Sequence, residues 1–300
     1  MVDLHHLATE QVNLKTIELD NMPIREALII MNEEDQKVAQ AIKPAIPQIE
    51  KAIHAVIDAL NNGGRLIYIG AGTSGRLGVL DAVECPPTFG TKPEQVIGLI
   101  AGGPDAFAKA VEGAEDSETS AQQDLESIQL NRRDVVVGIT ASGRTPYVLH
   151  GIRYAKTIGC QTIGIACNRP SELGELVDIA IEVVVGPEVL TGSTRLKAGT
   201  AQKMILNMIS TLSMVGIGKV YKNLMVDVQL TNQKLQSRAI HIIMNATGAT
   251  WEQARKALED ADGAVKVAIT MILLKCDAKK AQERLREAKG FIRKAIDYRS

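Results

Sequence analysis

Aromatic residues are scarce in this chain, at 3% of its 300 residues with a single tryptophan. Proteins that bind single-stranded nucleic acid stack bases on aromatic side chains, and few are available here. The formal net charge of −1 likewise offers no basic surface for DNA, RNA or anionic membranes. The composition therefore argues against nucleic acid as a partner and favours a compact, polar small molecule.

Cysteines and long apolar runs are also few. The four cysteines, at positions 85, 160, 167 and 276, show neither close pairing nor zinc-ligand spacing. We interpret them as reduced, packed thiols and expect no metal site. The chain opens without the basic and apolar stretches of a signal peptide, and no apolar run is long enough to span a bilayer. We therefore expect a cytoplasmic protein without a membrane partner.

Short β-rich runs alternate with helical patterns through the middle of the chain. They cover residues 65–69, 95–101, 134–140 and 161–166, with a fifth at 178–185. Near-continuous apolar strands of this kind predict an α/β fold, a three-layer αβα sandwich with a parallel sheet, whose ligands gather at the carboxyl ends of the strands. From Arg195 onward the pattern predicts helices alone. We expect an N-terminal helical segment packed on the core (1–64), a sheet domain (65–231) and a C-terminal helical bundle (232–300).

Proline residues mark expected breaks in the helices. Pro44 and Pro47 interrupt an early helical pattern, and a second helix is expected over residues 49–60. Pro86 and Pro87 follow another helical segment at residues 75–83 and should end or kink it, because proline lacks the N–H that a helix interior needs.

Two strand ends carry similar loops, GAGTSGR at residues 70–76 and TASGRT at residues 140–145. Each loop brings Ser and Thr hydroxyls and backbone N–H groups to the start of a helix, where partial positive charge favours a phosphate. Two such loops predict one phosphorylated-sugar site. The alternative is that Ser74, Ser142 and Thr145 only cap helices.

The first loop also satisfies the Gly-x-Gly-x-x-Gly pattern of dinucleotide sites through Gly70, Gly72 and Gly75. Such a site requires an acidic residue at the end of the second strand to bind the ribose, and only Asp105 lies near that position. The second Ser-Gly-Arg loop has no role in that scheme. NAD binding therefore ranks well below sugar-phosphate binding.

Acidic residues follow the loops and are candidates for acid–base chemistry. Glu84 belongs to the helical segment after the first loop, just before Cys85-Pro86-Pro87, near the expected edge of the site. Glu112, Glu115 and Asp116 cluster in the turn VEGAEDS at residues 111–117. By residue type alone, any one of these is more often a solvated surface carboxylate.

Several long strings are more specific than the glycine pattern. They are GAGTSGRLG (70–78), DAVECPP (81–87), VEGAEDS (111–117), ASGRTPY (141–147), TGSTRLKAGTAQK (191–203) and NLMVD (223–227), together with LATE at residues 7–10. Through these strings nearly the whole chain resembles the N-acetylmuramic acid 6-phosphate etherase family.

The resemblance implies a sugar isomerase (SIS) fold, a homodimer with sites near the subunit interface, and a C-terminal helical region similar to ubiquitin-associated domains. It implies that a phosphate is held by the two loops, through Thr73, Ser74, Gly75, Ser142, Gly143 and Thr145. It further implies that Glu84 is a proton donor and Glu115 a second active-site carboxylate. The implied role is peptidoglycan recycling, with N-acetylglucosamine 6-phosphate and D-lactate as products.

The implied reaction needs no metal or cofactor. In the open-chain sugar the C1 aldehyde acidifies the C2 proton, so a carboxylate base can remove it and the C3 ether can leave by β-elimination. The leaving oxygen takes a proton, and the enal then adds water, so one group can act as acid and afterwards as base. We assign that group to Glu84 and C2 deprotonation to Glu115, although the two roles can be exchanged. Lys197 is a candidate ligand for the lactyl carboxylate or the enolate, or else an exposed surface lysine.

Two other functions use the same fold. An aldose–ketose isomerase shares the C2 deprotonation, and a non-catalytic sugar-phosphate-sensing regulator shares the binding loops. A DNA-binding regulator should add a basic helix-turn-helix before the sheet. Residues 1–64 carry mixed charge and two prolines instead.

Overall fold

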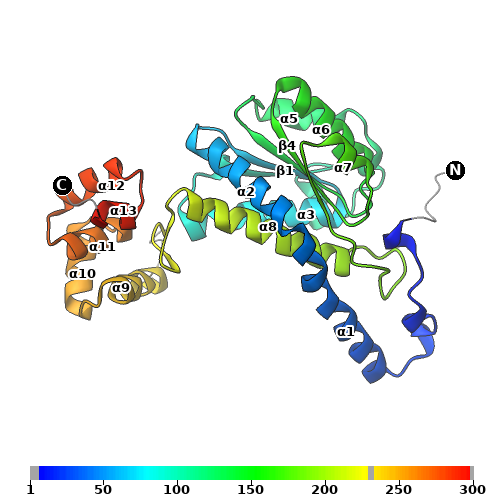
Figure 1. Cartoon of the computed structure of the whole chain (residues 1–300), viewed down its shortest axis with the longest axis horizontal. Coiled ribbons are helices and arrows are strands. Elements are labelled where there is room, and N and C mark those ends of the chain that lie inside the picture. The colour runs from blue at the N-terminus through cyan, green and yellow to red at the C-terminus, as the bar shows by residue number, and fades with distance from the viewer. Residues whose placement is uncertain (1–6, 229–232, 298–300) are drawn as a thin grey trace. The chain divides into compact units, whose positions relative to one another are not determined.

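The structure is a computed structural model that describes residues 7–228 and 233–297 (Figure 1). The chain forms two compact units. The first, called the sheet unit, comprises Met1–Val83 and Glu94–Ser210, and the second, called the helical unit, comprises Glu84–Pro93 and Thr211–Ser300. The division into residues 1–64, 65–231 and 232–300 stays a prediction.

The sheet unit is built on five parallel strands in the order β2-β1-β3-β4-β5. The strands are β1 Leu66–Gly70, β2 Val96–Ile100, β3 Val135–Ile139, β4 Gln161–Ala166 and β5 Ile179–Glu182. Each coincides with one of the predicted runs, so the predicted parallel sheet is confirmed. The central strands β1 and β3 are completely buried, which explains their continuous apolar character.

Helices cover both faces of the sheet (Figure 1). The first face carries α5 Ser120–Ser127, α6 Pro146–Ile158 and α7 Glu172–Leu176, and the second carries α2 Ile46–Asn61, α3 Gly72–Phe89 and α8 Lys197–Gly216. On the first face Ile67, Ile69 and Val136 pack against Val148 and Ile152 of α6 in one buried cluster. The predicted three-layer sandwich is confirmed.

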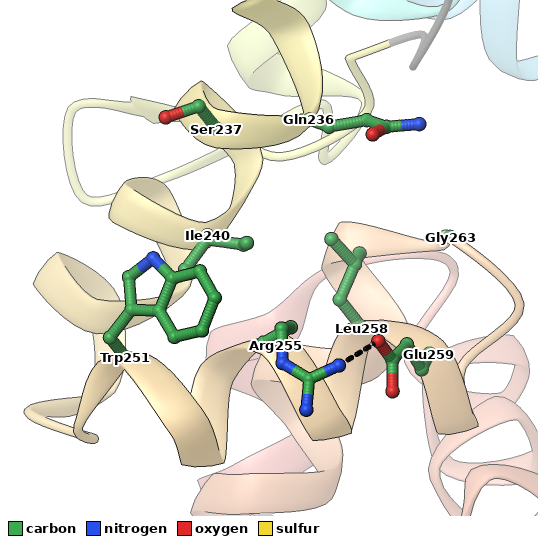
Figure 2. A pocket seen from close by; sticks show the side chains of 8 residues that line it. All are labelled: Gln236, Ser237, Ile240, Trp251, Arg255, Leu258, Glu259 and Gly263. Atoms are coloured by element: carbon green, nitrogen blue, oxygen red, sulfur yellow. Dashed lines mark hydrogen bonds and ion pairs between the residues drawn. The ribbon is translucent and has the colours of Figure 1, made fainter. Parts of the chain in front are cut away.

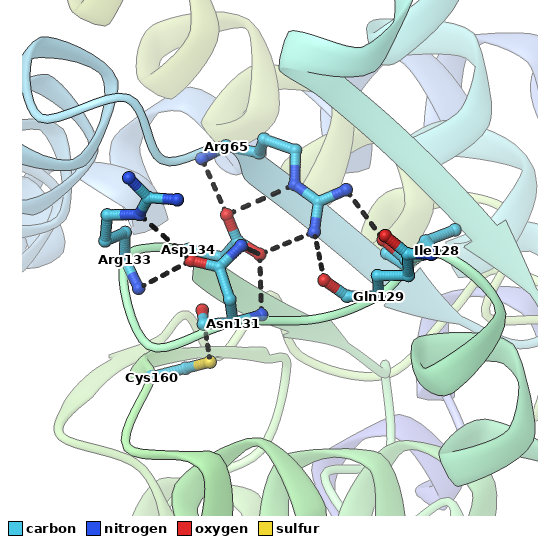
Figure 3. Close-up of polar contacts among 7 residues, drawn as sticks. All are labelled: Arg65, Ile128, Gln129, Asn131, Arg133, Asp134 and Cys160. Carbon is cyan, nitrogen blue, oxygen red and sulfur yellow. Dashed lines mark hydrogen bonds and ion pairs between the residues drawn. The ribbon is translucent and has the colours of Figure 1, made fainter.

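The register between β1 and β3 is held at the start of β3 by Asp134, whose side chain is fully buried. Its carboxylate accepts hydrogen bonds from the backbone N–H of Arg65 (3.0 Å), from the Arg65 guanidinium (2.7 Å) and from Asn131 (Figure 3). With this register, Gly70 pairs with Ile139 at the opposite, carboxyl end of the strands. The two loops that follow β1 and β3 therefore start level with each other.

The N-terminal helices follow the predicted proline break. Helix α1 spans Ile24–Ile42, and after the 3₁₀ turn Lys43–Ala45 helix α2 begins at Ile46 with Pro47 in its first turn. The short elements of the sheet unit are the 3₁₀ turns Ala8–Glu10, Leu14–Thr16, Leu19–Asn21, Pro93–Gln95 and Ala114–Asp116, and the single-turn helix α4 Asp105–Ala108.

Of the two outcomes predicted at Pro86 and Pro87, an end or a kink of the helix, the end does not occur. Helix α3 runs on through both prolines to Phe89. The fixed φ of proline is compatible with a helix, although each ring removes an N–H donor and crowds the carbonyl of the preceding turn. The carbonyl of Pro86 still accepts a bond from the N–H of Gly90 (2.9 Å).

The helical unit confirms the predicted C-terminal helices. They are α9 Gln233–Thr247, α10 Trp251–Asp260, α11 Val265–Leu274, α12 Ala278–Glu287 and α13 Ile292–Asp297. Ile243, Leu258, Ile269 and Leu285 form part of their common core.

The expectation of helices alone after Arg195 is wrong at one place. Strands β6 Val220–Tyr221 and β7 Leu224–Met225 form an antiparallel hairpin turned at Lys222, whose φ is +54°. Two-residue strands are too short to produce an alternating pattern in the sequence.

Two further predictions concern features of the whole chain. Its four cysteines are free, and Cys85, Cys160 and Cys167 are buried. Burial raises the pKa of Cys160 and of Cys167 to about 12, as expected for unreactive packed thiols. Among the described residues, no helix combines the length and apolar character needed to cross a bilayer.

Candidate active site

The two hydroxyl loops lie at one edge of the sheet. They follow β1 and β3, which are adjacent and parallel, so both loops leave from the carboxyl ends of the strands. After β1 the chain adds β2 on one side of it, and it then crosses to add β3 on the other side. The strand order therefore reverses between β1 and β3. Crevices at such switch points are where open α/β sheets bind ligands.

The first loop is set close to the sheet by two glycines. A Cβ on Gly75 would lie 2.6 Å from the carbonyl oxygen of Gly70, so only glycine allows this approach of helix and strand. Ser74, in the first turn of α3, donates from Oγ to Oε1 of Gln202 at 2.9 Å, and both side chains are buried. Thr73 lies beside Gly199 of α8, because its Cγ2 would be 3.4 Å from a Cβ placed on that glycine.

Gln202 is a candidate site residue that the sequence analysis missed. Its Nε2 is buried without a hydrogen-bond partner, so one polar group beside Ser74 remains available. Its place within the matched string of residues 191–203 was the available signal.

The second loop forms a small hydroxyl network. The Oγ1 atoms of Thr140 and Thr145 are 2.7 Å apart, and Ser142 Oγ is 3.2 Å from Thr140 Oγ1. Although Thr145 precedes α6, its side chain makes no capping bond, so the helix-cap alternative fails for this residue. Gly143 has φ +79°, and a Cβ there would lie 2.5 Å from Cβ of Ser171, which explains the glycine.

Glu115 lines a cavity of about 280 Å³ next to the first loop. Gly72 and Arg76 from the start of α3 form one wall, and Glu112 lines the cavity together with Glu115. Arg76 is held in place by donating to the carbonyl of Phe107 at 3.0 Å. Two carboxylates and a guanidinium therefore surround a space that is open to a polar ligand.

Glu84 does not line this cavity, although Arg76 of the same helix does. It is exposed and stands twelve residues beyond the first residue of α3. At 1.5 Å per residue, that separation is about 18 Å along the helix axis. Glu84 is absent from the lining of the cavity that holds Glu115.

Lys197 is buried, with 1% of its surface exposed. The interpretation as an exposed surface lysine is therefore wrong. Its Nζ donates to Glu34 Oε2 at 2.7 Å, and Glu34 also pairs with Lys37. Although burial by itself would raise the pKa of Glu34, the hydrogen bonds from Lys197 and Lys37 lower it to about 2.

The start of α8, at Lys197, is fixed by Glu188. This buried carboxylate accepts the backbone N–H groups of Lys197 (3.0 Å) and Ala198 (2.9 Å). Burial raises the pKa of Glu188 despite these bonds. The carboxylate satisfies N–H groups that the first turn of a helix leaves unpaired, and so orients the string of residues 191–203.

Asp81 is a second polar residue that the sequence analysis left without a role. It links three elements, because it accepts from the hydroxyl of Tyr68 on β1 (2.8 Å) and from Ser210 on α8 (3.0 Å). Burial raises its pKa to about 6.

A separate cavity of about 520 Å³ lies in the helical unit (Figure 2). Trp251, Ile240 and Leu258 line it, with Arg255 positioned 5.7 Å from the centre of the Trp251 ring. None of the predicted site residues lines this cavity. In the part of the chain that the structure describes, no group of three or more His, Cys, Asp or Glu side chains is arranged to hold a metal ion.

Three family models match successive parts of the chain. Residues 48–156 match the glucokinase regulatory protein N-terminal SIS domain, residues 111–212 match the SIS domain, and residues 222–261 match the C-terminal lid domain of glucokinase regulatory protein. The phosphoheptose isomerase from Neisseria gonorrhoeae is a solved structure with 16% identity and a TM-score of 0.49, covering 64% of this chain and 98% of its own.

Curated relatives match over nearly the full length. The N-acetylmuramic acid 6-phosphate etherase of Bacillus cytotoxicus is 60% identical over 98% of this chain and 100% of its own length. That of Geobacillus thermodenitrificans is 59% identical over the same shares of both chains. Given this identity along the whole chain, together with the SIS domain match, the protein belongs to the N-acetylmuramic acid 6-phosphate etherase family.

Proposed function

We propose that this protein cleaves the D-lactyl ether of N-acetylmuramic acid 6-phosphate and releases N-acetylglucosamine 6-phosphate and D-lactate. The observation that carries the proposal is the 60% identity to a curated etherase across 98% of the chain. The two hydroxyl loops at one sheet edge, with a carboxylate-lined cavity beside them, supply the groups that this reaction requires. The role fits cytoplasmic recycling of peptidoglycan sugars.

The sugar phosphate binds at the two loops in this proposal. Ser142 and Thr145 offer hydroxyls from the second loop, and Gly143, which packs too closely on Ser171 for a side chain, offers a backbone N–H. Thr73, Ser74 and Gly75 bind from the first loop, at the start of a long helix, where the helix dipole favours an anion. The Nε2 group of Gln202 can donate to Ser74 after an amide rotation, which frees the Ser74 hydroxyl to donate to phosphate.

Glu115 removes the C2 proton. It lines the cavity beside the first loop, so an open-chain sugar whose phosphate lies on the loops extends toward it. The Arg76 guanidinium on the same cavity wall can stabilise the enolate that forms when C2 loses its proton. Elimination then breaks the C3–O bond, and the lactyl oxygen takes a proton as it leaves.

Glu84 supplies that proton and later activates the water that adds to C3. Because Glu84 does not line the cavity that holds Glu115, we place it in the site of a second subunit. A homodimer is supported by exposed apolar side chains on α1, where Ile24 is 80% and Leu28 is 60% exposed, and on α8, where Leu212 is 49% exposed. Each site then combines Glu115 of one chain with Glu84 of the other.

Lys197 remains a proposed ligand for the lactyl carboxylate. Its ammonium is engaged by Glu34, so this role requires that the pair opens or that the substrate carboxylate joins it.

Lactate release from N-acetylmuramic acid 6-phosphate tests the function, and exchange of the C2 proton with deuterated buffer tests the roles. Glu84→Gln should abolish lactate release while exchange persists, because the amide cannot transfer the proton. Glu115→Gln should suppress both by about 100-fold or more. The matched control is Glu118→Gln, an exposed carboxylate three residues from Glu115. Exchange lost in Glu84→Gln but kept in Glu115→Gln would reverse the two roles, and normal lactate release by both variants would remove the carboxylate mechanism.

Mixing the two inactive variants tests the shared site. If Glu84 and Glu115 come from different chains, a heterodimer of Glu84→Gln and Glu115→Gln contains one intact site, and refolding them together should restore activity. If both act within one chain, the mixture stays inactive. Sedimentation showing only monomer at micromolar concentration would contradict the dimer itself.

A further inference from the structure

The short motif LATE at residues 7–10 has no role in the reaction described above. It opens an N-terminal strap, defined here as residues 7–16, which lies on the sheet unit. Thr9 is completely buried although it is polar, so its surroundings must satisfy its hydrogen-bonding groups.

Asn168, just after β4, is the partner of Thr9. Its Nδ2 donates to Thr9 Oγ1 at 3.0 Å, and its Oδ1 accepts the backbone N–H of Thr9 at 3.4 Å. The same Nδ2 also donates to the carbonyls of Ala141 (3.1 Å) and Ser142 (3.3 Å) in the second hydroxyl loop. One buried amide therefore joins the strap to the loop proposed to bind phosphate.

The orientation of this amide follows from its partners. The Ser142 carbonyl needs a donor, and the backbone N–H of Thr9 needs an acceptor, so Nδ2 must face the loop and Oδ1 the backbone of the strap. The Ala141 carbonyl also accepts from the backbone N–H of Cys167 (3.0 Å), so the bond from Asn168 adds to one already made. Asn168 is 2% exposed, which leaves little room for water to replace a lost partner.

The strap has a second attachment beside the same site. Asn13 donates from Nδ2 to the carbonyl of Pro187 at 3.4 Å. A Cβ on Gly192 would lie 3.3 Å from the Glu10 carboxylate. The strap thus lies against the segment that leads into Lys197 as well as against the second loop.

We propose that Thr9 and Asn168 are positioning residues for phosphate binding, because their hydrogen bonds hold the Ala141 and Ser142 carbonyls and thereby aim the Ser142 hydroxyl. This role rests on the proposed function, in which the second loop binds the substrate phosphate. Pre-organised loops bind without first becoming ordered, so loosening the contact between Thr9 and Asn168 should weaken phosphate binding more than it slows the chemical steps.

Thr9→Val tests the role because it keeps the branched shape and removes only the hydroxyl. We expect the KM for N-acetylmuramic acid 6-phosphate and the inhibition constant of inorganic phosphate to rise about 3- to 10-fold, with kcat nearly unchanged. Thr9→Ser should restore both constants. The matched control is Thr16→Val, a buried strap threonine whose hydroxyl donates to the Asn13 carbonyl (3.3 Å) and not to Asn168. It should lower thermal stability without changing either constant.

A double-mutant cycle with Ser142→Ala shows whether Thr9 acts through the loop. The effect of Thr9→Val on phosphate inhibition should largely disappear in the Ser142→Ala background, and additive effects would overturn the proposal. Should Thr9→Val fail to fold, Asn168→Ser serves in its place, with the same expected loss. An unchanged KM in Ser142→Ala would count against the proposed function. If Ser142→Ala raises the KM but Thr9→Val changes neither constant, as expected for Thr16→Val, the positioning role alone is overturned.

Discussion

The buried ion pair between Lys197 and Glu34 allows the structural and the substrate-binding roles of Lys197 to be separated. The two side chains are 1% and 3% exposed and are 2.7 Å apart. Removing one partner of such a pair leaves a buried charge without compensation, which costs about 3–5 kcal/mol of unfolding free energy. Removing both partners costs much less, since no unpaired charge remains.

The surroundings of Glu34 make the two single substitutions unequal. Lys37 also pairs with Glu34, and Lys15 lies 3.7 Å from it. Lys197→Met therefore leaves Glu34 with cationic neighbours, whereas Glu34→Gln takes from Lys197 the carboxylate that its Nζ contacts. We expect Glu34→Gln to be the more destabilising change, and the double variant Glu34→Gln with Lys197→Met to recover most of the loss.

The pH dependence provides a second measure of the pair. The pKa of Glu34 falls from 4.5 to about 2 in the folded state. The stabilisation it contributes is therefore present above about pH 4.5 and is lost as the pH falls towards 2, in total about 3 kcal/mol. Glu34→Gln should remove this part of the acid dependence.

Urea unfolding followed by circular dichroism, with lactate release on the same samples, separates the outcomes. If Lys197 also binds the lactyl carboxylate, the double variant should regain stability while its KM remains high. Recovery of both stability and KM would show that Lys197 serves only the ion pair. Unfolding free energies within about 0.5 kcal/mol of the unsubstituted protein for both single variants would refute the energetic reasoning.

Three further predictions follow from individual observations. Asp81→Asn removes a carboxyl whose pKa burial raises to about 6, so its protonated form stabilises the folded state at low pH and this stabilisation is lost as the pH rises through 6. The unfolding free energy of the variant, relative to that of the unsubstituted protein, should therefore rise by up to about 3 kcal/mol between pH 4 and pH 7.5. A difference that stays constant with pH would contradict this prediction. Gln202→Leu removes the amide whose rotated Nε2 would donate to Ser74 and so aim its hydroxyl at the phosphate, and it should raise KM about 10-fold. An unchanged KM would exclude Gln202 from the site. Lactate release should survive exhaustive treatment with EDTA, and activity lost in EDTA and restored by a divalent ion would contradict the metal-free mechanism.

The sheet and its active edge were predictable because they depend on local pattern. Buried parallel strands are continuous apolar runs, so all five were found within a few residues of their observed ends. The predicted helix end at the prolines and the missed hairpin also have local causes. Helix α3 tolerates Pro86 and Pro87, and the hairpin of β6 and β7 is too short to leave a periodic signal.

The site was only partly predictable. Ser142 and Thr145 attract notice because hydroxyls beside glycine after a strand are typical of phosphate loops. Gln202, Asp81 and Asn168 carry no such signal, since each acquires its role from a partner far along the chain. Gln202 contacts Ser74 across a separation of 128 residues, and Thr9 contacts Asn168 across 159.

By itself, then, the sequence determined the fold class, the two loops and the family, because these are written in residue type, periodicity and contiguous strings. Only the tertiary structure decided that Lys197 is buried against Glu34, that Ser74 donates to Gln202, and that the motif at residues 7–10 is tied to the second loop. The physical reason is that burial and hydrogen bonding depend on which segments meet in space. A lysine at a helix start is equally consistent with a solvated or a buried charge until the carboxylate of a distant helix is seen to lie 2.7 Å from it.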